Sequence, residues 1–218
     1  MKKLVVFDLD GTLIDSIEDL ADSGNYALKQ CGLPLHTIEE YKYIVGDGVD
    51  TKILRCLPPE ERENQELFQK VKAIYLPYYA AHSQDKTHPY PGIDELLIQC
   101  GEKGVLTAVV SNKPHAIAKE VVRHYFPKIH FAAVIGQNEE VPKKPDPTGV
   151  KLVLSQTGVS PSDALYVGDT CVDIQTAKNS GLPSCGVLWG FRTKQELVEN
   201  GADHIAANPR ELSKIIFA

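Results

Sequence analysis

The sequence predicts an α/β fold, with a Rossmann-like, mostly parallel sheet flanked by helices and an all-helical cap domain inserted after the first strand. The first observation is the apolar run Leu4–Phe7, whose β-branched residues and charged boundaries are typical of a strand buried on both faces. The second is the region after about residue 88, in which apolar runs alternate with helical patterns, as in βαβ units with right-handed crossovers. The third is the segment between Asp15 and Asp85, which shows helical periods and no strand pattern.

Bulk composition narrows the classes of partner. The chain has 218 residues, of which 43% are hydrophobic and 24% are charged, as in ordinary globular proteins. Its formal net charge of −6 offers no basic field for nucleic acid or for an anionic membrane surface. No apolar run reaches the roughly 18 residues that a membrane helix needs. We therefore expect a small-molecule substrate, and no nucleic acid or membrane partner.

The cysteines indicate a reducing compartment. The five are odd in number and contain no C-x-x-C pair, which argues against a disulfide scaffold or a zinc ribbon and favours the cytoplasm. The first residues, Met1–Lys3, superficially resemble the start of a signal peptide. However, Asp8 and Asp10 interrupt the apolar run, and no cleavage site of small residues follows. We interpret this segment as mature protein.

Helical patterns account for the predicted cap, residues 16–87. Ser16 is a candidate N-cap for a first helix over 17–29. Pro58 and Pro59 precede a long amphipathic helix, in which Pro77 should cause a kink. The other expected cap elements are a short helix that begins at Thr37 and a helix over 49–57, separated by Gly46-Asp47-Gly48.

The predicted core consists of residues 1–15 and 88–218, with 86–91 as a proline-stiffened linker out of the cap. An insertion directly after the first strand places the cap over the carboxyl end of that strand, where a lid would lie. Strands are expected at 105–110, 131–135, 164–167, 185–188 and 204–206, and helices at 93–102, 114–125, 147–156, 173–179 and 194–199.

Polar residues follow two of the predicted strands. Asp8 and Asp10 come directly after the first strand, at the end where parallel sheets collect ligands. An Asp-Gly turn after an edge strand explains them equally well. Ser111 and Asn112 follow the strand over 105–110, where a hydroxyl and free backbone N–H groups at a helix N-terminus would make a phosphate cradle. Taken alone, these two residues are better explained as caps of the next helix.

A later strand and the loop before it add charged residues. Asp169 follows the strand over 164–167, and Asp173 lies one helical turn further on, where it could face the same cavity or simply balance the helix dipole. The loop over 141–147 is stiffened by prolines and carries Lys143 and Lys144. A rigid loop positions an ammonium well, although a solvated lysine is the simpler explanation.

Together these segments predict a cation site. Two like charges ~4 Å apart repel by about 4 kcal/mol at an effective dielectric of about 20, so a group of carboxylates at one cavity needs positive charge. No cysteine or histidine lies in these motifs, and a set of oxygen ligands favours Mg²⁺ over Zn²⁺. Lys144 would supply the remaining positive charge.

The same residues resemble the four motifs of the haloacid dehalogenase superfamily, in order and along essentially the whole chain. The motifs are Asp8-Leu9-Asp10-Gly11-Thr12, Ser111-Asn112, Lys144-Pro145-Asp146-Pro147, and Gly168-Asp169 through Asp173. The helical insertion is similar to the cap of the phosphoglycolate phosphatase-like branch. Smaller similarities to that branch are Val45-Gly46-Asp47-Gly48, Tyr90-Pro91-Gly92, Ser111-Asn112-Lys113-Pro114 and Gly186-Val187-Leu188-Trp189-Gly190.

This resemblance implies stepwise phosphoryl transfer. Asp8 would attack phosphorus, form an aspartyl phosphate and also bind Mg²⁺. Asp10 would protonate the leaving group, then deprotonate the attacking water, with its backbone carbonyl on the metal. Asp169 would bind the metal directly, whereas Asp173 would act through water or as a supporting acid.

The resemblance also implies a set of phosphate-binding residues. Ser111 would hydrogen-bond the phosphoryl oxygens, with Asn112 beside it in the cradle. Lys144 would hold the phosphoryl group and Asp8 together, which supplies the positive charge that phosphoryl transfer requires.

Asp10 favours hydrolysis of phosphate esters, because similar dehalogenases and phosphonate hydrolases lack this second acid. The expected enzyme is therefore a phosphatase of small phosphorylated metabolites, with 2-phosphoglycolate as the leading substrate. Pyrophosphate, sugar phosphates and nucleoside monophosphates are alternatives, as is phosphomutase activity. A non-hydrolytic receiver-like signalling domain is an alternative of a different class, but it would need neither Asp10 nor a cap. A catalytically inert binding module is disfavoured by the complete motif set.

Substrate contacts in the cap are less sharply defined. Many relatives carry Asn or Glu at the position of Asp47 in the cap loop. Lys42, Lys52 and Arg55 are candidates for holding a substrate carboxylate, although each could also be a solvated side chain. Cys171, inside the metal motif, could be a redox-sensitive thiol or a small packing residue. The oligomeric state is left open. The cap candidates are Gly46, Asp47, Gly48, Lys42, Lys52 and Arg55.

Overall fold

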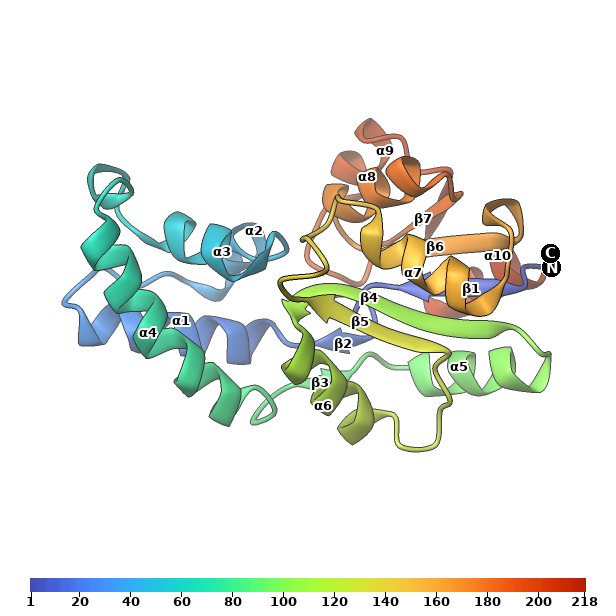
Figure 1. Ribbon diagram of the computed structural model, residues 1–218, viewed down its shortest axis with the longest axis horizontal. Coiled ribbons are helices and arrows are strands. Elements are labelled where there is room, and N and C mark those ends of the chain that lie inside the picture. Colours follow the sequence, from blue (N-terminus) through green and yellow to red (C-terminus); the bar gives the residue numbers. More distant parts are fainter.

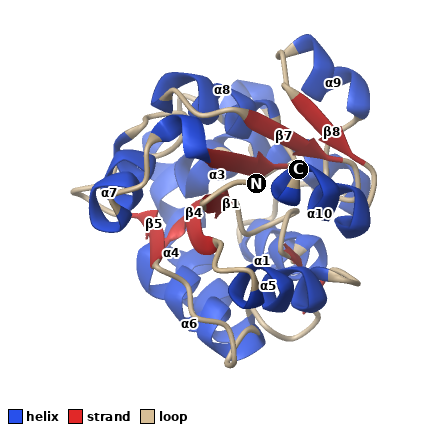
Figure 2. Cartoon of the chain, turned by 90° about the vertical axis from the view of Figure 1, so that its right-hand side faces the viewer, coloured by secondary structure: helices blue, strands red, loops and turns tan.

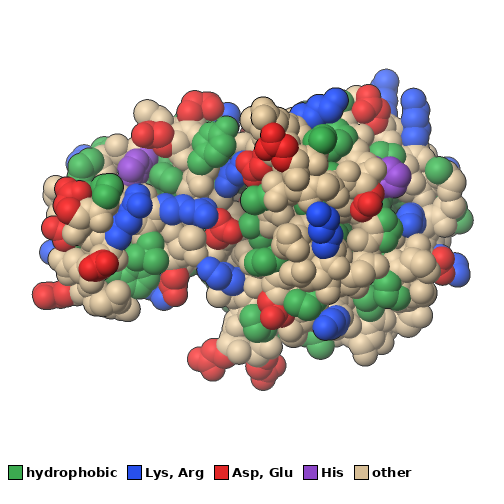
Figure 3. All heavy atoms as spheres, turned by 90° about the horizontal axis from the view of Figure 1, so that it is seen from above, with side chains coloured by type: hydrophobic (Ala, Val, Ile, Leu, Met, Phe, Trp, Pro, Cys, Tyr) green, Lys and Arg blue, Asp and Glu red, His purple; other side chains and the backbone are tan.

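The computed structural model describes residues 1–218 and consists of two parts that lie side by side (Figure 1). One part contains the large sheet and both termini, and the other is helical. Met1 contacts Ala218 at the end of the molecule far from the helical part. On the face shown in Figure 3, basic and acidic side chains are interspersed. No helix is both long enough and apolar enough to cross a membrane.

A six-stranded sheet, in the order β5-β4-β1-β6-β7-β8, forms the centre of the core, and every pairing in it is parallel. β1 lies between β4 and β6, so the chain builds outward from β1 in both directions. Ligands bind at such a point, beyond the carboxyl ends of the strands. The strands are β1 (Leu4–Phe7), β4 (Leu106–Pro114), β5 (Ala133–Gln137), β6 (Ala164–Gly168), β7 (Ser184–Val187) and β8 (His204–Ala206).

Helices cover both faces of this sheet (Figure 2). All four β1 residues are fully buried. Val5 and Phe7 pack with α5, α6 and α10, whereas Leu4 and Val6 pack with α7 and α8 on the other face. This confirms the buried parallel strand, in which successive side chains point to opposite faces. The helices are α5 (Ile93–Glu102), α6 (His115–Tyr125), α7 (Thr148–Thr157), α8 (Cys171–Ser180), α9 (Lys194–Glu199) and α10 (Pro209–Phe217).

The inserted segment is helical, as expected, and has its own hydrophobic cluster. Tyr41, Ile53 and Tyr75 are at its centre, and Phe191 is the one buried member from outside the insertion. This separate cluster supports the boundaries at 15/16 and 87/88, which remain a prediction. The cap helices are α1 (Ile17–Gln30), α2 (Ile38–Ile44), α3 (Gly48–Cys56) and α4 (Gln65–His82).

A two-stranded antiparallel ribbon of β2 (Ile14–Asp15) and β3 (His88–Pro89) joins the two connections between cap and core. Beside it, the buried Asp19 carboxylate accepts two backbone hydrogen bonds. The Lys86 N–H donates to Oδ1 at 3.0 Å, and the Thr87 N–H donates to Oδ2 at 2.9 Å. It also accepts the Thr87 hydroxyl at 2.6 Å. The predicted linker is thus partly a strand, too short to give a period-2 pattern.

Two details of the helices differ from expectation. The prediction that Pro58 and Pro59 start the long cap helix is wrong. Pro59–Glu61 forms a separate 3-10 turn (η1), and α4 begins only at Gln65, where the Asn64 side chain accepts the Leu67 N–H at 3.1 Å. α4 then continues through Pro77 to His82. The C-terminal helix α10 was not predicted, although Asn208 caps it in the same manner.

Candidate active site

A pocket lies between the carboxyl ends of the core strands and the cap. Asp8, Asp10, Ser111 and Asn112 line it from the core. Gly46, Gly48, Lys52, Tyr75 and Tyr79 line it from the cap. The structure therefore brings residues from both ends of the chain and from the insertion to one cavity.

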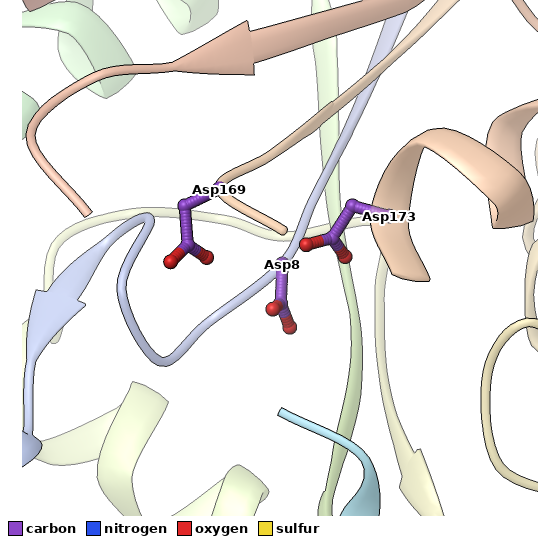
Figure 4. A group of neighbouring side chains, drawn as sticks. All are labelled: Asp8, Asp169 and Asp173. Carbon is purple, nitrogen blue, oxygen red and sulfur yellow. The ribbon is translucent and has the colours of Figure 1, made fainter. Parts of the chain in front are cut away.

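Three buried carboxylates meet at the floor of this region (Figure 4). Asp8 follows β1, Asp169 follows β6, and Asp173 lies in the first turn of α8. One oxygen from each lies within 4.8 Å of the others. Three of the four predicted acids are thus close enough to share one cation, and the Asp10 carboxylate is not among them.

Glycines allow this close packing around Asp169. Gly11 has φ +83°, and a Cβ added there would lie 2.3 Å from Asp169 Oδ2. A Cβ on Gly190 would lie 2.3 Å from the Asp169 Cβ. Any side chain at either position would displace the carboxylate, so the backbone approach requires glycine.

Asp169 is fully buried, with only neutral hydrogen-bond donors from the protein. Its oxygens accept the Thr12 hydroxyl at 3.2 Å and the Phe191 N–H at 2.8 Å. Burial raises the pKa of Asp169 well above its ordinary value, and the Asp173 and Asp8 charges raise it further. A carboxylate in this position would be stabilised by a bound cation.

Asp173 has both oxygens engaged by the protein. It forms a capping box with Thr170, whose N–H and hydroxyl donate at 3.0 and 2.8 Å. Its other oxygen accepts the Lys144 ammonium at 2.7 Å. The structure therefore supports both functions considered for this acid, since it starts helix α8 and also holds a charged group of the site.

Lys144 joins the carboxylates. Its ammonium lies 2.8 Å from Asp8 Oδ1 and 2.7 Å from Asp173 Oδ1, and the side chain is buried. Burial alone would lower the pKa of Lys144, but the Asp173 and Asp8 charges raise it well above its ordinary value. The Asn112 side chain accepts the Lys144 N–H at 2.6 Å and so fixes the loop that carries the lysine.

Asp8 is the most accessible of the three acids, although still only 7% exposed. Its pKa is raised to about 7. Burial is the main cause, the Asp173 and Asp10 charges act in the same direction, and the Lys144 charge opposes them. Asp8 Oδ1 is paired with the Lys144 ammonium at 2.8 Å and accepts no other donor from the protein. Its lone pairs are therefore available to a cation or an electrophile.

Asp10 has two partners that local sequence does not reveal. Ser16 donates its hydroxyl to Asp10 Oδ1 at 2.6 Å, and the Lys113 ammonium lies 2.8 Å from the same oxygen. Ser16 occupies the N-cap position of α1, as predicted, but its hydroxyl donates to Asp10 and makes no cap hydrogen bond to the helix.

Lys113 is the main residue that sequence reasoning missed. β4 was expected to end near Val110 but runs to Pro114, so Ser111 and Lys113, two residues apart, are on the same strand. The Ser111 hydroxyl accepts the Lys113 N–H at 3.2 Å and donates to no protein acceptor. Its proton is free to point into the pocket.

Core side chains hold the cap loop over the pocket. Asn112 donates to the Gly46 carbonyl at 2.9 Å, and Arg192 donates to the Val45 carbonyl at 3.0 Å. Lys143 donates to the Thr51 hydroxyl at 2.7 Å. Of the two lysines in the proline-rich loop, Lys143 thus contacts the cap, whereas Lys144 contacts the acids.

The three basic cap candidates have different surroundings. Lys42 pairs with Glu39 at 2.8 Å, and Arg55 pairs with Asp47. Neither Lys42 nor Arg55 lines the pocket. Lys52 lines the pocket and is 3% exposed. Burial lowers the pKa of Lys52 to about 7.

Cys171 is partly buried at the start of α8. Burial and the neighbouring Glu196 raise the pKa of its thiol to about 11. Because the thiolate is the reactive form, this environment favours the packing function over the redox function.

Comparison with known proteins gives consistent matches over most of the chain. Residues 5–187 match the family described as haloacid dehalogenase-like hydrolases. The chain is 31% identical over 218 residues to the phosphoglycolate phosphatase of Vibrio parahaemolyticus, covering 98% of this chain and 96% of that protein. The phosphoglycolate phosphatase of Pseudomonas putida is 32% identical over 194 residues, which cover 88% of this chain and 71% of that protein.

Solved structures share the architecture. A protein of Lactobacillus delbrueckii subsp. bulgaricus, whose description as a phosphoglycolate phosphatase is itself a prediction, has a TM-score of 0.93 at 34% identity, covering 99% of both chains. CbbY of Rhodobacter sphaeroides, solved in complex with a xylulose bisphosphate, has a TM-score of 0.79 at 21% identity, covering 97% of this chain and 96% of its own. At that identity the CbbY comparison supports the fold alone.

Proposed function

Because the chain belongs to the haloacid dehalogenase-like hydrolase family, as its four motifs predict, we propose that it is a Mg²⁺-dependent phosphatase of small phosphorylated metabolites. The leading substrate is 2-phosphoglycolate, which the names of the relatives support. The observation that carries the proposal is the Asp8 carboxylate, paired with buried Lys144 and exposed to a pocket that Asp10 also lines.

The donor set fits Mg²⁺. Asp8 and Asp169 would bind the ion with carboxylate oxygens, and Asp10 with its backbone carbonyl, while Asp173 would support them. These are hard oxygen ligands, and three of the carboxylates approach within 4.8 Å with one lysine as counter-charge. When bound, the ion would neutralise negative charge on the phosphoryl oxygens.

In the proposed first step, an Asp8 oxygen forms a bond to phosphorus while the bond from phosphorus to the ester oxygen breaks. Asp10, in its protonated form, gives its proton to the leaving oxygen. Lys144 donates to the phosphoryl oxygens and keeps Asp8 oriented. Ser111 donates the hydroxyl proton that no protein acceptor uses.

In the second step, the aspartyl phosphate is hydrolysed. Asp10, now ionised, takes a proton from water as the water attacks phosphorus, and Asp8 is released. Ser16 and Lys113 hold the Asp10 carboxylate at its place in the pocket. The cap contacts of Asn112 and Arg192 limit access of bulk water during both steps.

Other substrates and a receiver-like function are the alternatives to this proposal, and they differ in the residues that they need. Pyrophosphate, sugar phosphates, nucleoside monophosphates and a phosphomutase reaction would use the same core residues. A receiver-like domain would form a phospho-aspartate without rapid hydrolysis, and it would need neither Asp10 nor the cap. The five free cysteines support the prediction of a cytoplasmic enzyme.

The test is release of inorganic phosphate from 2-phosphoglycolate with and without Mg²⁺, beside a panel of the alternative substrates. We expect activity that a chelator removes, that Mg²⁺ restores and that Asp8→Asn abolishes. Turnover by Asp8→Asn would contradict the mechanism. A stable phosphoenzyme without turnover would favour the receiver-like alternative, and greater efficiency on another phosphate ester would replace 2-phosphoglycolate as the substrate.

A further inference from the structure

Lys113, on core strand β4, is a buried ammonium held between a core acid and a cap hydroxyl. Its side chain is only 1% exposed, and its Nζ donates to Asp10 Oδ1 at 2.8 Å and to the Tyr79 hydroxyl. Tyr79 belongs to cap helix α4, whereas Asp10 follows core strand β1 (Figure 1). A single ammonium therefore connects a hydroxyl of the cap to the proposed acid/base of the reaction.

Both donors that reach the Asp10 carboxylate use the same oxygen. Ser16 donates its hydroxyl to Oδ1 beside Lys113, whereas Oδ2 accepts no donor from the protein. When Asp10 is protonated, its proton must be on Oδ2, because Oδ1 already accepts two hydrogen bonds. Lys113 also stabilises the carboxylate that forms once Oδ2 has given this proton away. The contacts at Oδ1 thus decide which oxygen of Asp10 exchanges the proton.

Tyr79 offers Lys113 a rigid partner. It is buried, and its ring stacks on Tyr75, one turn earlier in α4, with the ring centroids 5.4 Å apart. Burial raises the pKa of Tyr79 well above its ordinary value, and the Asp10 and Asp19 charges raise it further, so the hydroxyl stays neutral. Because a lysine side chain is flexible, this second fixed partner restricts where the Lys113 ammonium lies.

We propose that Tyr79 is a positioning residue for proton transfer by Asp10, acting through the Lys113 ammonium. The Tyr79 hydroxyl fixes Lys113, and Lys113 together with Ser16 fixes Oδ1, so that Oδ2 carries the proton for the leaving oxygen. This inference rests on the proposed phosphatase function and goes beyond it, since it assigns a cap side chain to the acid–base step.

A purely structural function for Tyr79 makes a different prediction. Its contact with Lys113 also joins α4 of the cap to β4 of the core. If Tyr79 only fastened the cap, loss of its hydroxyl would slow every substrate alike and would weaken substrate binding. Positioning of a proton donor instead lowers the rate only for a leaving group that needs the proton, with KM nearly unchanged.

The experiment compares 2-phosphoglycolate with 4-nitrophenyl phosphate for wild type and Tyr79→Phe, which keeps the stacked ring and removes only the hydroxyl. We expect the first-turnover rate of glycolate release to fall at least about 10-fold, because a hydrogen bond to a charged group is lost. Nitrophenol release in the first turnover should change by less than about threefold, because nitrophenolate leaves without a proton. KM should change by less than about threefold for both substrates.

Lys113→Met and the double variant test whether Tyr79 acts through Lys113. Lys113→Met should show the same dependence on the leaving group, and adding Tyr79→Phe to it should cause no further loss. Tyr78→Phe is the matched control. Tyr78 is the adjacent residue of α4, stacks on Tyr26 with centroids 3.8 Å apart and does not line the pocket, so this variant should keep the wild-type rates.

Three results would overturn the inference: no loss in Tyr79→Phe, equal losses on both substrates, or a double variant whose loss is the product of the two single losses. If Tyr79→Phe does not fold, Lys113→Met decides, and equal losses on both substrates there overturn the inference. Failure of the phosphatase proposal is separate, because wild type would then release neither glycolate nor nitrophenol.

Discussion

Asp10 and Lys52 illustrate how single residues acquire their properties from partners on other segments of the chain. The Asp10 carboxylate is held by Ser16 from the connection into the cap and by Lys113 from β4. Lys52 is held among cap tyrosines without a counter-charge. Two predictions concern these side chains.

Replacing Asp10 by Asn should impair the two steps unequally, depending on the leaving group. With 2-phosphoglycolate, kcat should fall about 10²- to 10⁴-fold, because the alkoxide leaving group loses its general acid. With 4-nitrophenyl phosphate, the first step should be less affected, because nitrophenolate leaves without a proton. Rapid-quench measurement of nitrophenol release against phosphate release checks this. Equal loss in the first step for both substrates would remove Asp10 from the acid function.

The pH dependence of stability should report on Lys52. Burial lowers its pKa to about 7 in the folded protein, against about 10.4 in the unfolded chain. Between these values the unfolded state binds more protons, so the free energy of unfolding contributed by Lys52 rises with pH and is lowest below about pH 7. The ionisable groups around it are Tyr41, Tyr75, Tyr79, Cys56, Lys113 and Asp10.

The measurement is urea unfolding of wild type and Lys52→Met from about pH 7 to about pH 10. The difference in unfolding free energy should shift in favour of wild type as pH rises. A constant difference across this range would show that Lys52 titrates normally in the folded state.

At the scale of elements, the connection between cap and core depends on a short ribbon and one buried acid. β2 and β3 pair over only two residues each, so their hydrogen bonds are few. Asp19, on the first turn of α1, fastens the returning chain at Lys86 and Thr87. A lid that opens and closes needs such a fixed pivot.

Asp19→Ala should destabilise the protein by about 2–4 kcal/mol, because it leaves buried N–H groups without acceptors. Asp22→Ala is the matched control, since Asp22 is exposed on the same helix and pairs with Lys86 at 2.8 Å on the surface. It should cost no more than about 1 kcal/mol. Chemical denaturation compares the two, and amide hydrogen exchange at Thr87 should accelerate only in Asp19→Ala. Similar effects of both substitutions would show that the buried contacts add nothing.

At the scale of the whole molecule, the pocket exists only because the cap rests on the core. Asn112 and Arg192 hold the cap loop from the core side, and Phe191 enters the hydrophobic cluster of the cap. Beneath this closed arrangement, Asp8, Asp169 and Asp173 repel one another. The folded state should therefore respond strongly to a divalent cation.

Mg²⁺ should raise the Tm of wild type in a concentration-dependent manner. At 100 times its Kd it should add about 2.7 kcal/mol to the free energy of unfolding. Asp169→Asn should lose most of this response, yet be at least as stable as wild type without Mg²⁺, because one repelling charge is removed. Calorimetry with Mg²⁺ and with a chelator checks both effects. An unchanged Mg²⁺ response in Asp169→Asn would place the metal elsewhere.

Local patterns were sufficient for much of this architecture. The apolar run before Asp8 predicts a buried central strand, and the fold confirms it, because four consecutive large apolar residues need cover on both faces. Alternation after residue 88 predicts the parallel sheet. The short β2–β3 ribbon and η1 were missed or misplaced, because two- or three-residue elements leave little periodic signal. The nine-residue α10 was also missed, although Leu212 and Ile216 stand at helical spacing after the Asn208 cap.

The sequence by itself determined that acids, a hydroxyl and a lysine stand near the carboxyl ends of strands that a parallel sheet brings to one edge, because apolar runs mark the strands, although β4 continues beyond its apolar run to Pro114. Only the tertiary structure decided which charges meet. It paired Ser16 and Lys113 with Asp10, turned Lys42 and Arg55 toward Glu39 and Asp47, and buried Lys52 among tyrosines. The Lys113–Asp10 pair and the burial of Lys52 depend on segments far apart in the chain, which helix and strand periods do not encode, whereas Lys42 and Glu39 are neighbours on one helix.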